Sequence, residues 1–154
     1  MKTIKVAEVY QVHGTCTVSI PQDSPLENII NRLGHEPELH AVFLVDSHQR
    51  LAGVITRISL MKWVHSQLFG GRRQLSPWEV LQFAHATRAK DLIHSDWQSL
   101  AVKESDNLES ALNIMIDHDE DVLPVLDSEG TVLGDLRLSE VLLKVLEVGR
   151  QARP

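Results

Sequence analysis

Apolar residues recur along this chain in two patterns, one with the period of a helix and one in short continuous runs. Residues 24–33, "SPLENIINRL", and 106–115, "DNLESALNIM", carry apolar side chains three and four positions apart. That spacing places them on one face of a helix. The runs at 41–46, "AVFLVD", and 122–127, "VLPVLD", are apolar up to a closing aspartate. Short runs of this kind predict buried strands.

Each of these two runs is followed by a polar turn and a second short run. The second runs are "LAGVI" at 51–55 and "VLGDL" at 132–136, both with glycine in third place. Two apolar runs joined by a few turn residues predict a β-hairpin. A further helix is expected after each hairpin, beginning near Thr56 and near Arg137.

The two helical segments carry the same signal at their starts. Ser24 is followed three residues later by Glu27, and Asp106 is followed by Glu109. In a capping box of this type the two side chains accept hydrogen bonds from backbone N–H groups left unpaired at the helix start. We therefore predict a capping box at each of these helices.

These matches belong to an internal repeat with an offset of about 81 to 83 residues. "VAEVY" at 6–10 corresponds to "AKDLI" at 89–93, and "TVSI" at 17–20 corresponds to "LAV" at 100–102. Self-similarity along the whole chain indicates a duplicated structural unit.

The repeat divides the chain into a first unit at 1–62 and a second unit at 88–154, with a helical insertion at 63–87 between them. Inside the insertion, Ser76 and Glu79 form a third capping-box signal, with proline at the first helical position. This pattern predicts an amphipathic connecting helix.

Composition restricts the class of protein. The chain has 154 residues, 43% of them hydrophobic and 23% charged, with a net charge of −6. These values are typical of a soluble globular protein, and the acidic balance argues against a nucleic-acid partner. No apolar run approaches the length needed to cross a membrane, and the N-terminus lacks a secretory apolar segment. We expect a cytoplasmic protein, in which the lone Cys16 is an unreactive strand residue.

Four segments, "AKDLI", "DNLESALNIM", "LPVLDSEGTVLG" and "GVITRISLM", together resemble a tandem CBS-domain pair, often called a Bateman module. The resemblance covers nearly the whole chain apart from the insertion and the last residues. It implies an α+β fold of two β-α-β-β-α units packed as a pseudo-two-fold pair. It also implies a non-enzymatic regulatory module whose clefts hold AMP, ADP, ATP, S-adenosylmethionine or NAD. Such a module would form homodimers and regulate an enzyme or transporter.

The family places a threonine at the start of the last helix of each unit and an acid three residues later. A helix start attracts phosphate, and a carboxylate there can accept both ribose hydroxyls. The first unit has Thr56 but carries Ser59 at the acidic position, and the second has Glu140 but carries Arg137 at the threonine position. Threonine followed by an acid is also an ordinary capping box, so the cap remains an alternative. Arg137 is either a bidentate phosphate ligand or a solvated surface residue.

Glu140 is the single acid at either ribose position, so we predict that the second unit's cleft is the better adenosyl site. Leu123 and Pro124, on the neighbouring strand, would flank the adenine. The alternative is a protein-interaction module with degenerate clefts. The predicted ligand-binding residues are Thr56, Ser59, Leu123, Pro124, Arg137 and Glu140.

No catalytic or metal site is expected, and no cofactor is required. The chain contains no G-x-S-x-G elbow, phosphate loop or dinucleotide fingerprint. In "HEPELH", His35 and His40 are five positions apart, and Pro37 would break a helix between them. The segment "VLLKVLEV" at 141–148 is apolar on more than one face, which predicts a homodimer contact.

Overall fold

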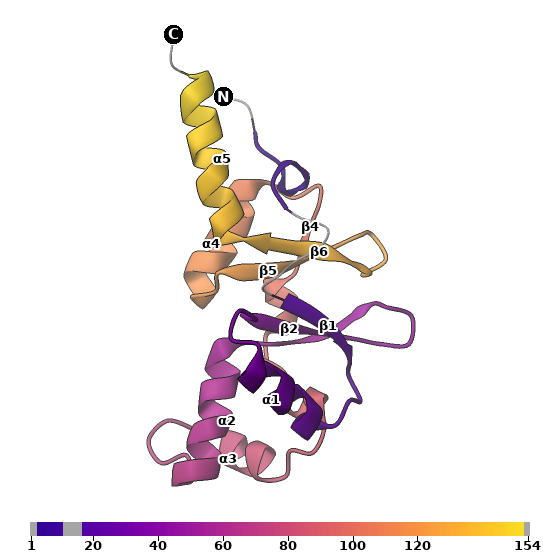
Figure 1. Ribbon diagram of the computed structural model, residues 1–154, viewed down its shortest axis with the longest axis vertical. Coiled ribbons are helices and arrows are strands. Elements are labelled where there is room, and N and C mark those ends of the chain that lie inside the picture. The colour runs from indigo at the N-terminus through magenta and orange to yellow at the C-terminus, as the bar shows by residue number, and fades with distance from the viewer. Residues whose placement is uncertain (1–2, 11–16, 153–154) are drawn as a thin grey trace. The chain divides into compact units, whose positions relative to one another are not determined.

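The structure is a computed structural model that describes residues 3–10 and 17–152 (Figure 1). Cys16 lies outside the described residues. In chain order the elements are η1 (Val6–Glu8), β1 (Thr17–Pro21), α1 (Leu26–His35), β2 (Ala41–Val45), β3 (Leu51–Ile55), α2 (Arg57–Phe69), α3 (Pro77–Ala84), η2 (Ala89–Leu92), η3 (Trp97–Leu100), β4 (Val102–Lys103), α4 (Leu108–His118), β5 (Val122–Leu126), β6 (Val132–Arg137) and α5 (Leu138–Gln151). The α+β class predicted from the sequence is confirmed.

The strands form two three-stranded sheets of the same topology, ordered β1-β2-β3 and β4-β5-β6 (Figure 1). In each sheet the first pair is parallel and the second is antiparallel. A parallel pair needs a crossover connection, which α1 provides in one sheet and α4 in the other. The antiparallel pairs are the two predicted hairpins, and both are confirmed.

One aspartate organises each hairpin turn. Oδ1 of Asp46 accepts hydrogen bonds from the N–H groups two and four residues later, at 2.8 and 3.0 Å. Oδ1 of Asp127 makes the same two bonds at 2.8 and 2.9 Å. Aspartate favours turns because its side chain can replace a backbone acceptor in this way. These bonds explain why both apolar runs end in aspartate.

The chain packs as two compact units. The first unit is Thr15–Trp97, and the second unit combines Met1–Gly14 with Gln98–Pro154. The packing units therefore differ from the sequence repeats, since each repeat's leading segment packs with the other repeat's sheet. The predicted insertion belongs to the first unit, where Phe83 of α3 is buried in the core.

The exchanged segments make equivalent backbone hydrogen bonds. In the first unit, Leu26 N donates to Thr87 O at 3.0 Å. In the second unit, Leu108 N donates to Ile4 O at 2.8 Å. Each bond uses the N–H of the first residue of α1 or α4. The leading segments thus hold the starts of the crossover helices.

This exchange explains why two predicted capping boxes are wrong. The N-cap residues are Pro25 for α1 and Asn107 for α4, and neither makes a side-chain capping bond. Ser24 and Asp106 lie one residue too early, and the exchanged segment already accepts from the first helical N–H. The Asp106 carboxylate instead accepts from Lys103 N at 2.9 Å.

The third capping box is confirmed. Ser76 Oγ accepts from Glu79 N at 3.2 Å, and Glu79 Oε1 accepts from Ser76 N at 3.0 Å. Pro77 is the first residue of α3, as its fixed backbone angle favours. No exchanged segment reaches this helix start in the described contacts, so the local signal decides its structure.

Candidate functional site

Both predicted helix starts are present at the ends of hairpin strands. Thr56 is the N-cap of α2 and follows β3, in the first unit. Arg137 is the N-cap of α5 and is the last residue of β6, in the second unit. The two starts differ in what their side chains do.

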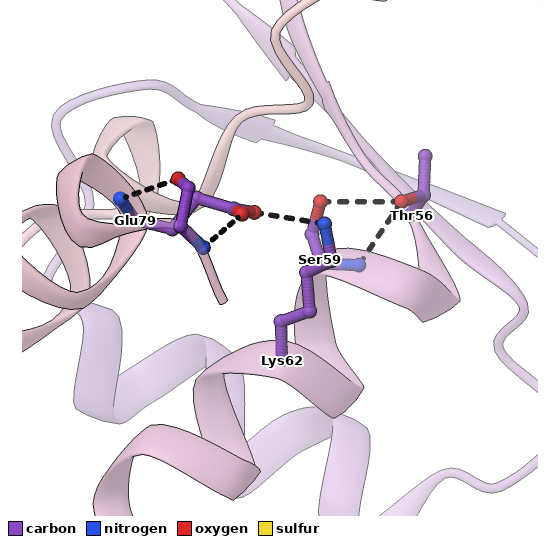
Figure 2. A network of polar contacts seen from close by, with 5 residues as sticks. Thr56, Ser59, Lys62 and Glu79 are labelled. Atoms are coloured by element: carbon purple, nitrogen blue, oxygen red, sulfur yellow. Dashed lines mark hydrogen bonds and ion pairs between the residues drawn. The ribbon is translucent and has the colours of Figure 1, made fainter. Parts of the chain in front are cut away.

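At the start of α2 the two hydroxyls bind each other. Thr56 Oγ1 accepts from Ser59 N at 3.2 Å and donates to Ser59 Oγ at 3.2 Å (Figure 2). Thr56 is 1% exposed and Ser59 is 7% exposed. Thr56 therefore caps its helix, and a ligand could use its hydroxyl as a new donor only by taking it from Ser59.

An ion pair joins α2 to α3 near this start. Lys62 Nζ lies 2.8 Å from Glu79 Oε2, while the other oxygen of Glu79 serves the capping box of α3 (Figure 2). The bond from Lys62, followed by the backbone N–H of Ser76, lowers the pKa of the Glu79 carboxyl. The polar groups drawn together in Figure 2 are satisfied by their own chain.

The start of α5 contains a buried carboxylate with one free oxygen. Glu140 Oε1 accepts from Arg137 N at 3.0 Å, which closes the helix start. Glu140 Oε2 is buried and has no hydrogen-bond partner among the residues that the structure describes. Burial raises the pKa of this carboxyl, and the Asp135 charge raises it further, against the opposing effect of Arg137. A buried acceptor without a partner is unfavourable, so this oxygen would be stabilised by any donor that reached it.

Arg137 is buried and paired, so it is not the solvated surface residue that the sequence left open. Its Nε lies 3.1 Å from Oδ1 of Asp135, and their side chains are 10% and 1% exposed. Sequence reasoning missed Asp135. The available signal was an acidic residue inside the otherwise apolar run "VLGDL".

A hollow of about 180 Å³ lies against Glu140 in the second unit. It is lined by Glu8, Val9, Glu140, Leu143, Lys144 and Glu147. The residues from α5 lie three and four positions apart and so share one helix face. The hollow thus lies against the residue whose second carboxylate oxygen has no partner among the described residues.

The predicted adenine-flanking residues lie away from this hollow in the β5–β6 ladder. Leu123 is opposite Leu136 and Pro124 is opposite Asp135. Leu123 is 0% exposed. The structure thus brings Arg137, Glu140 and Asp135 together and places Leu123 in the core.

In ranges 3–10 and 17–152, no three His, Cys, Asp or Glu side chains are grouped so that they could hold a metal ion. No helix in those ranges is both long enough and apolar enough to span a membrane.

Comparison with known proteins gives consistent matches. The family model for the CBS domain matches residues 9–66 and 89–147. A CBS domain-containing protein from Thermotoga maritima is 24% identical, with a TM-score of 0.75 over 96% of this chain and 97% of that chain. CBSX2, solved in complex with AMP and known from Arabidopsis thaliana, is 17% identical, with a TM-score of 0.71 over 95% and 98%.

A third solved structure carries different ligands. The CBS domain pair of protein MJ0100, in complex with 5′-methylthioadenosine and S-adenosyl-L-methionine, is 13% identical. Its TM-score is 0.65 over 97% of this chain and 99% of that chain. No curated protein sequence matches this chain significantly.

Proposed function

This chain belongs to the CBS-domain family and contains two copies of the domain, and from that premise we propose that it is a regulatory module that binds an adenosine-containing ligand at the start of α5. The observation that carries the proposal is the buried, unpartnered Oε2 of Glu140 beside a hollow in the second unit. The adenosyl ligands of CBSX2 and of the MJ0100 pair support the ligand class.

The chemistry of the carboxylate fits a ribose. Adjacent hydroxyls on a ribose are donors, and an ionised carboxylate has acceptor sites on both oxygens. In Glu140 one oxygen is held by Arg137 N, which fixes the orientation of the other. A ribose hydroxyl would supply the hydrogen bond that Oε2 lacks.

We propose that the ligand is bound without reacting, and that its binding changes how this module regulates an enzyme or transporter. A ligand shifts a conformational equilibrium only as far as its affinity differs between the two states. Glu140 lies in the first turn of α5 and its Oε1 closes the helix start, so a ligand on Oε2 would bias the position of that helix.

A second proposal is that two copies of the chain associate through α5. Apolar residues are exposed on more than one face of this helix, among them Leu142 at 57% and Leu143 at 67%. A groove of about 710 Å³ runs along the same helix, with Leu108 and Leu112 of α4 in its wall. Exposed apolar surface of this extent marks a contact site. The same exposed apolar surface also favours the alternative function, which is a protein-interaction module that needs no ligand.

A thermal-shift panel of AMP, ADP, ATP, S-adenosylmethionine and NAD tests the main proposal. A ligand that binds only the folded state at 100 times its Kd adds about 2.7 kcal/mol to the unfolding free energy. We expect at least one compound to raise the midpoint temperature of thermal unfolding. If none does so at millimolar concentration, the interaction module is the better description.

Two variants locate the site by calorimetry. Glu140→Ala removes the charged acceptor for a ligand hydroxyl, so we expect binding about tenfold to a hundredfold weaker. Thr56→Ala removes a helix cap, so we expect a loss of about 1 kcal/mol in unfolding free energy and little change in affinity. The opposite result, with Thr56→Ala losing the ligand, would place the site in the first unit.

A further inference from the structure

We propose that the site at the start of α5 selects an uncharged or cationic nucleoside over a nucleotide. The ligand class would be adenosine-like compounds whose 5′ substituent carries no phosphate, including thioethers and sulfonium compounds. This inference rests on the proposed function and concerns the same carboxylate, Glu140. It separates two ligand types that a ribose contact alone cannot distinguish.

The charges around the site are mainly negative. Among the described residues that line the hollow, Glu8, Glu140 and Glu147 are acidic and Lys144 is the one cationic residue. Lys144 Nζ lies 3.4 Å from Glu147 Oε1, so its charge is already partly compensated. A phosphate placed here would face an excess of like charge, whereas a sulfonium or ammonium group would be attracted.

The arginine that could bind a phosphate is already engaged. Arg137 Nε lies 3.1 Å from Asp135 Oδ1, and both side chains are almost fully buried. If Arg137 turned to a phosphate, it would leave the Asp135 charge buried without that partner, which is strongly unfavourable. Asp135 therefore holds Arg137 away from the role that the sequence suggested for it.

The backbone at the helix start is also engaged. Phosphate usually binds to free N–H groups at the first turn of a helix. Here Arg137 N donates to Glu140 Oε1 at 3.0 Å, and Leu138 N donates to Asp121 O at 2.9 Å. Two N–H groups of this start thus already have acceptors, and the first-turn acid opposes the positive end of the helix dipole.

Titration calorimetry of the full chain with two matched ligand pairs tests the selection. Adenosine and AMP differ by a phosphate, and S-adenosylmethionine and S-adenosylhomocysteine differ by a methyl group and one positive charge. At low salt we expect adenosine to bind at least about tenfold more tightly than AMP, a difference of about 1.4 kcal/mol. We also expect S-adenosylmethionine to bind more tightly than S-adenosylhomocysteine. Both differences should narrow as salt screens the charges.

Asp135→Asn releases Arg137 and removes one negative charge, so the ratio of AMP to adenosine affinity should rise about tenfold. Because Asp135 is buried, Glu147→Gln on the exposed rim provides a second variant, with a smaller rise expected. Glu109→Gln, on α4 and outside the lining of the small hollow, is the control for losing one charge, and should leave the ratio unchanged.

The outcomes separate the two proposals. If AMP binds as tightly as adenosine and Glu140→Gln weakens both, the selection is overturned while the proposed function stands. If Asp135→Asn and Glu147→Gln both leave the ratio unchanged, the electrostatic origin of the selection is overturned. If none of the four compounds binds but ADP, ATP or NAD raises the unfolding midpoint in the thermal-shift panel, the selection is overturned while the proposed function stands. If no compound of either set binds, both proposals fail.

Discussion

One carboxylate oxygen of Glu140 accepts a hydrogen bond at the helix start, and the other is buried without a partner among the described residues. This arrangement has a consequence for stability. Burial raises the pKa of the carboxyl above its ordinary value of 4.5. When a carboxyl has a higher pKa in the folded state than in the unfolded state, its contribution to the unfolding free energy is fully present below the unfolded-state pKa. That contribution is lost as pH rises through the folded-state pKa. Ionised Glu140 is therefore a source of instability at neutral pH.

We predict that Glu140→Gln becomes more stable relative to the wild type as pH rises above about 4.5. Glutamine keeps an acceptor for Arg137 N but cannot ionise. Urea unfolding of both proteins between pH 4 and 8 measures the difference, with Glu109→Gln as the control for one lost surface charge. A difference that does not change with pH would show that Glu140 titrates normally.

Gly53 is required by a close contact rather than by its backbone angles. A Cβ at this position would lie 2.6 Å from Ile93 Cδ1 and 2.7 Å from Cγ1. Ile93 belongs to the leading segment of the second repeat, which packs within the first unit, Thr15–Trp97. The glycine in third place of "LAGVI" thus admits a side chain from 40 residues later.

We predict that Gly53→Ala lowers the unfolding free energy by about 1–3 kcal/mol, because the buried strand would be overpacked. In a double-mutant cycle with Ile93→Ala, the combined loss should be smaller than the sum of the two single losses. Gly34→Ala is the control, since nothing lies within 4 Å of its Cβ position and alanine favours the helix. Strict additivity of Gly53→Ala and Ile93→Ala would contradict this account.

Between elements, the Lys62–Glu79 pair connects two helices of the first unit. α2 and α3 lie side by side (Figure 1), and Glu79 both caps α3 and pairs with α2. Because the pKa of Glu79 is lowered in the folded state, the contribution of its carboxylate to the unfolding free energy is present above the unfolded-state pKa. That contribution is lost as pH falls through the folded-state pKa. The direction is opposite to that of Glu140.

We predict that Glu79→Gln lowers the unfolding free energy at pH 7 by about 0.5–1 kcal/mol, a modest value because solvent screens a partly exposed pair. The amide keeps the acceptor for Ser76 N, so the loss reports the ion pair rather than the cap. The loss should disappear as pH falls well below 4.5, the ordinary pKa of the group. In a Lys62→Met background the same substitution should have little effect, and a full effect there would argue against the pair.

At the scale of the whole molecule, the exposed apolar residues of α5 predict self-association. We expect a species of about 35 kDa in sedimentation, twice the chain mass of 17.3 kDa. Leu142→Glu with Leu146→Glu places charge on the contact and should shift the protein to monomer, since burying an unpaired charge is unfavourable. Gln151→Glu adds a charge to an exposed polar position on another face of the same helix and should not. A wild-type monomer at high concentration would rule out the dimer.

The sequence by itself determined the duplicated architecture. Hairpins, helix starts at Thr56 and Arg137, and the box at Ser76 all depend on residues within a few positions of one another. Apolar periodicity and turn chemistry act at that range, so they are readable without coordinates. The acidic position of Glu140 was found in the same way, by its spacing from Arg137.

Only the tertiary structure decided which hydrogen-bond partners and how much burial the residues of those elements have. Ser24 and Asp106 do not cap their helices because exchanged backbone segments about 60 and 100 residues away reach the helix starts instead. Side-chain direction and burial decide three further features. Arg137 pairs with Asp135, Leu123 is buried in the core, and one oxygen of Glu140 has no partner among the described residues. Local spacing cannot specify these features, because hydrogen-bond partners and solvent access are set by whichever distant segments the fold brings into contact.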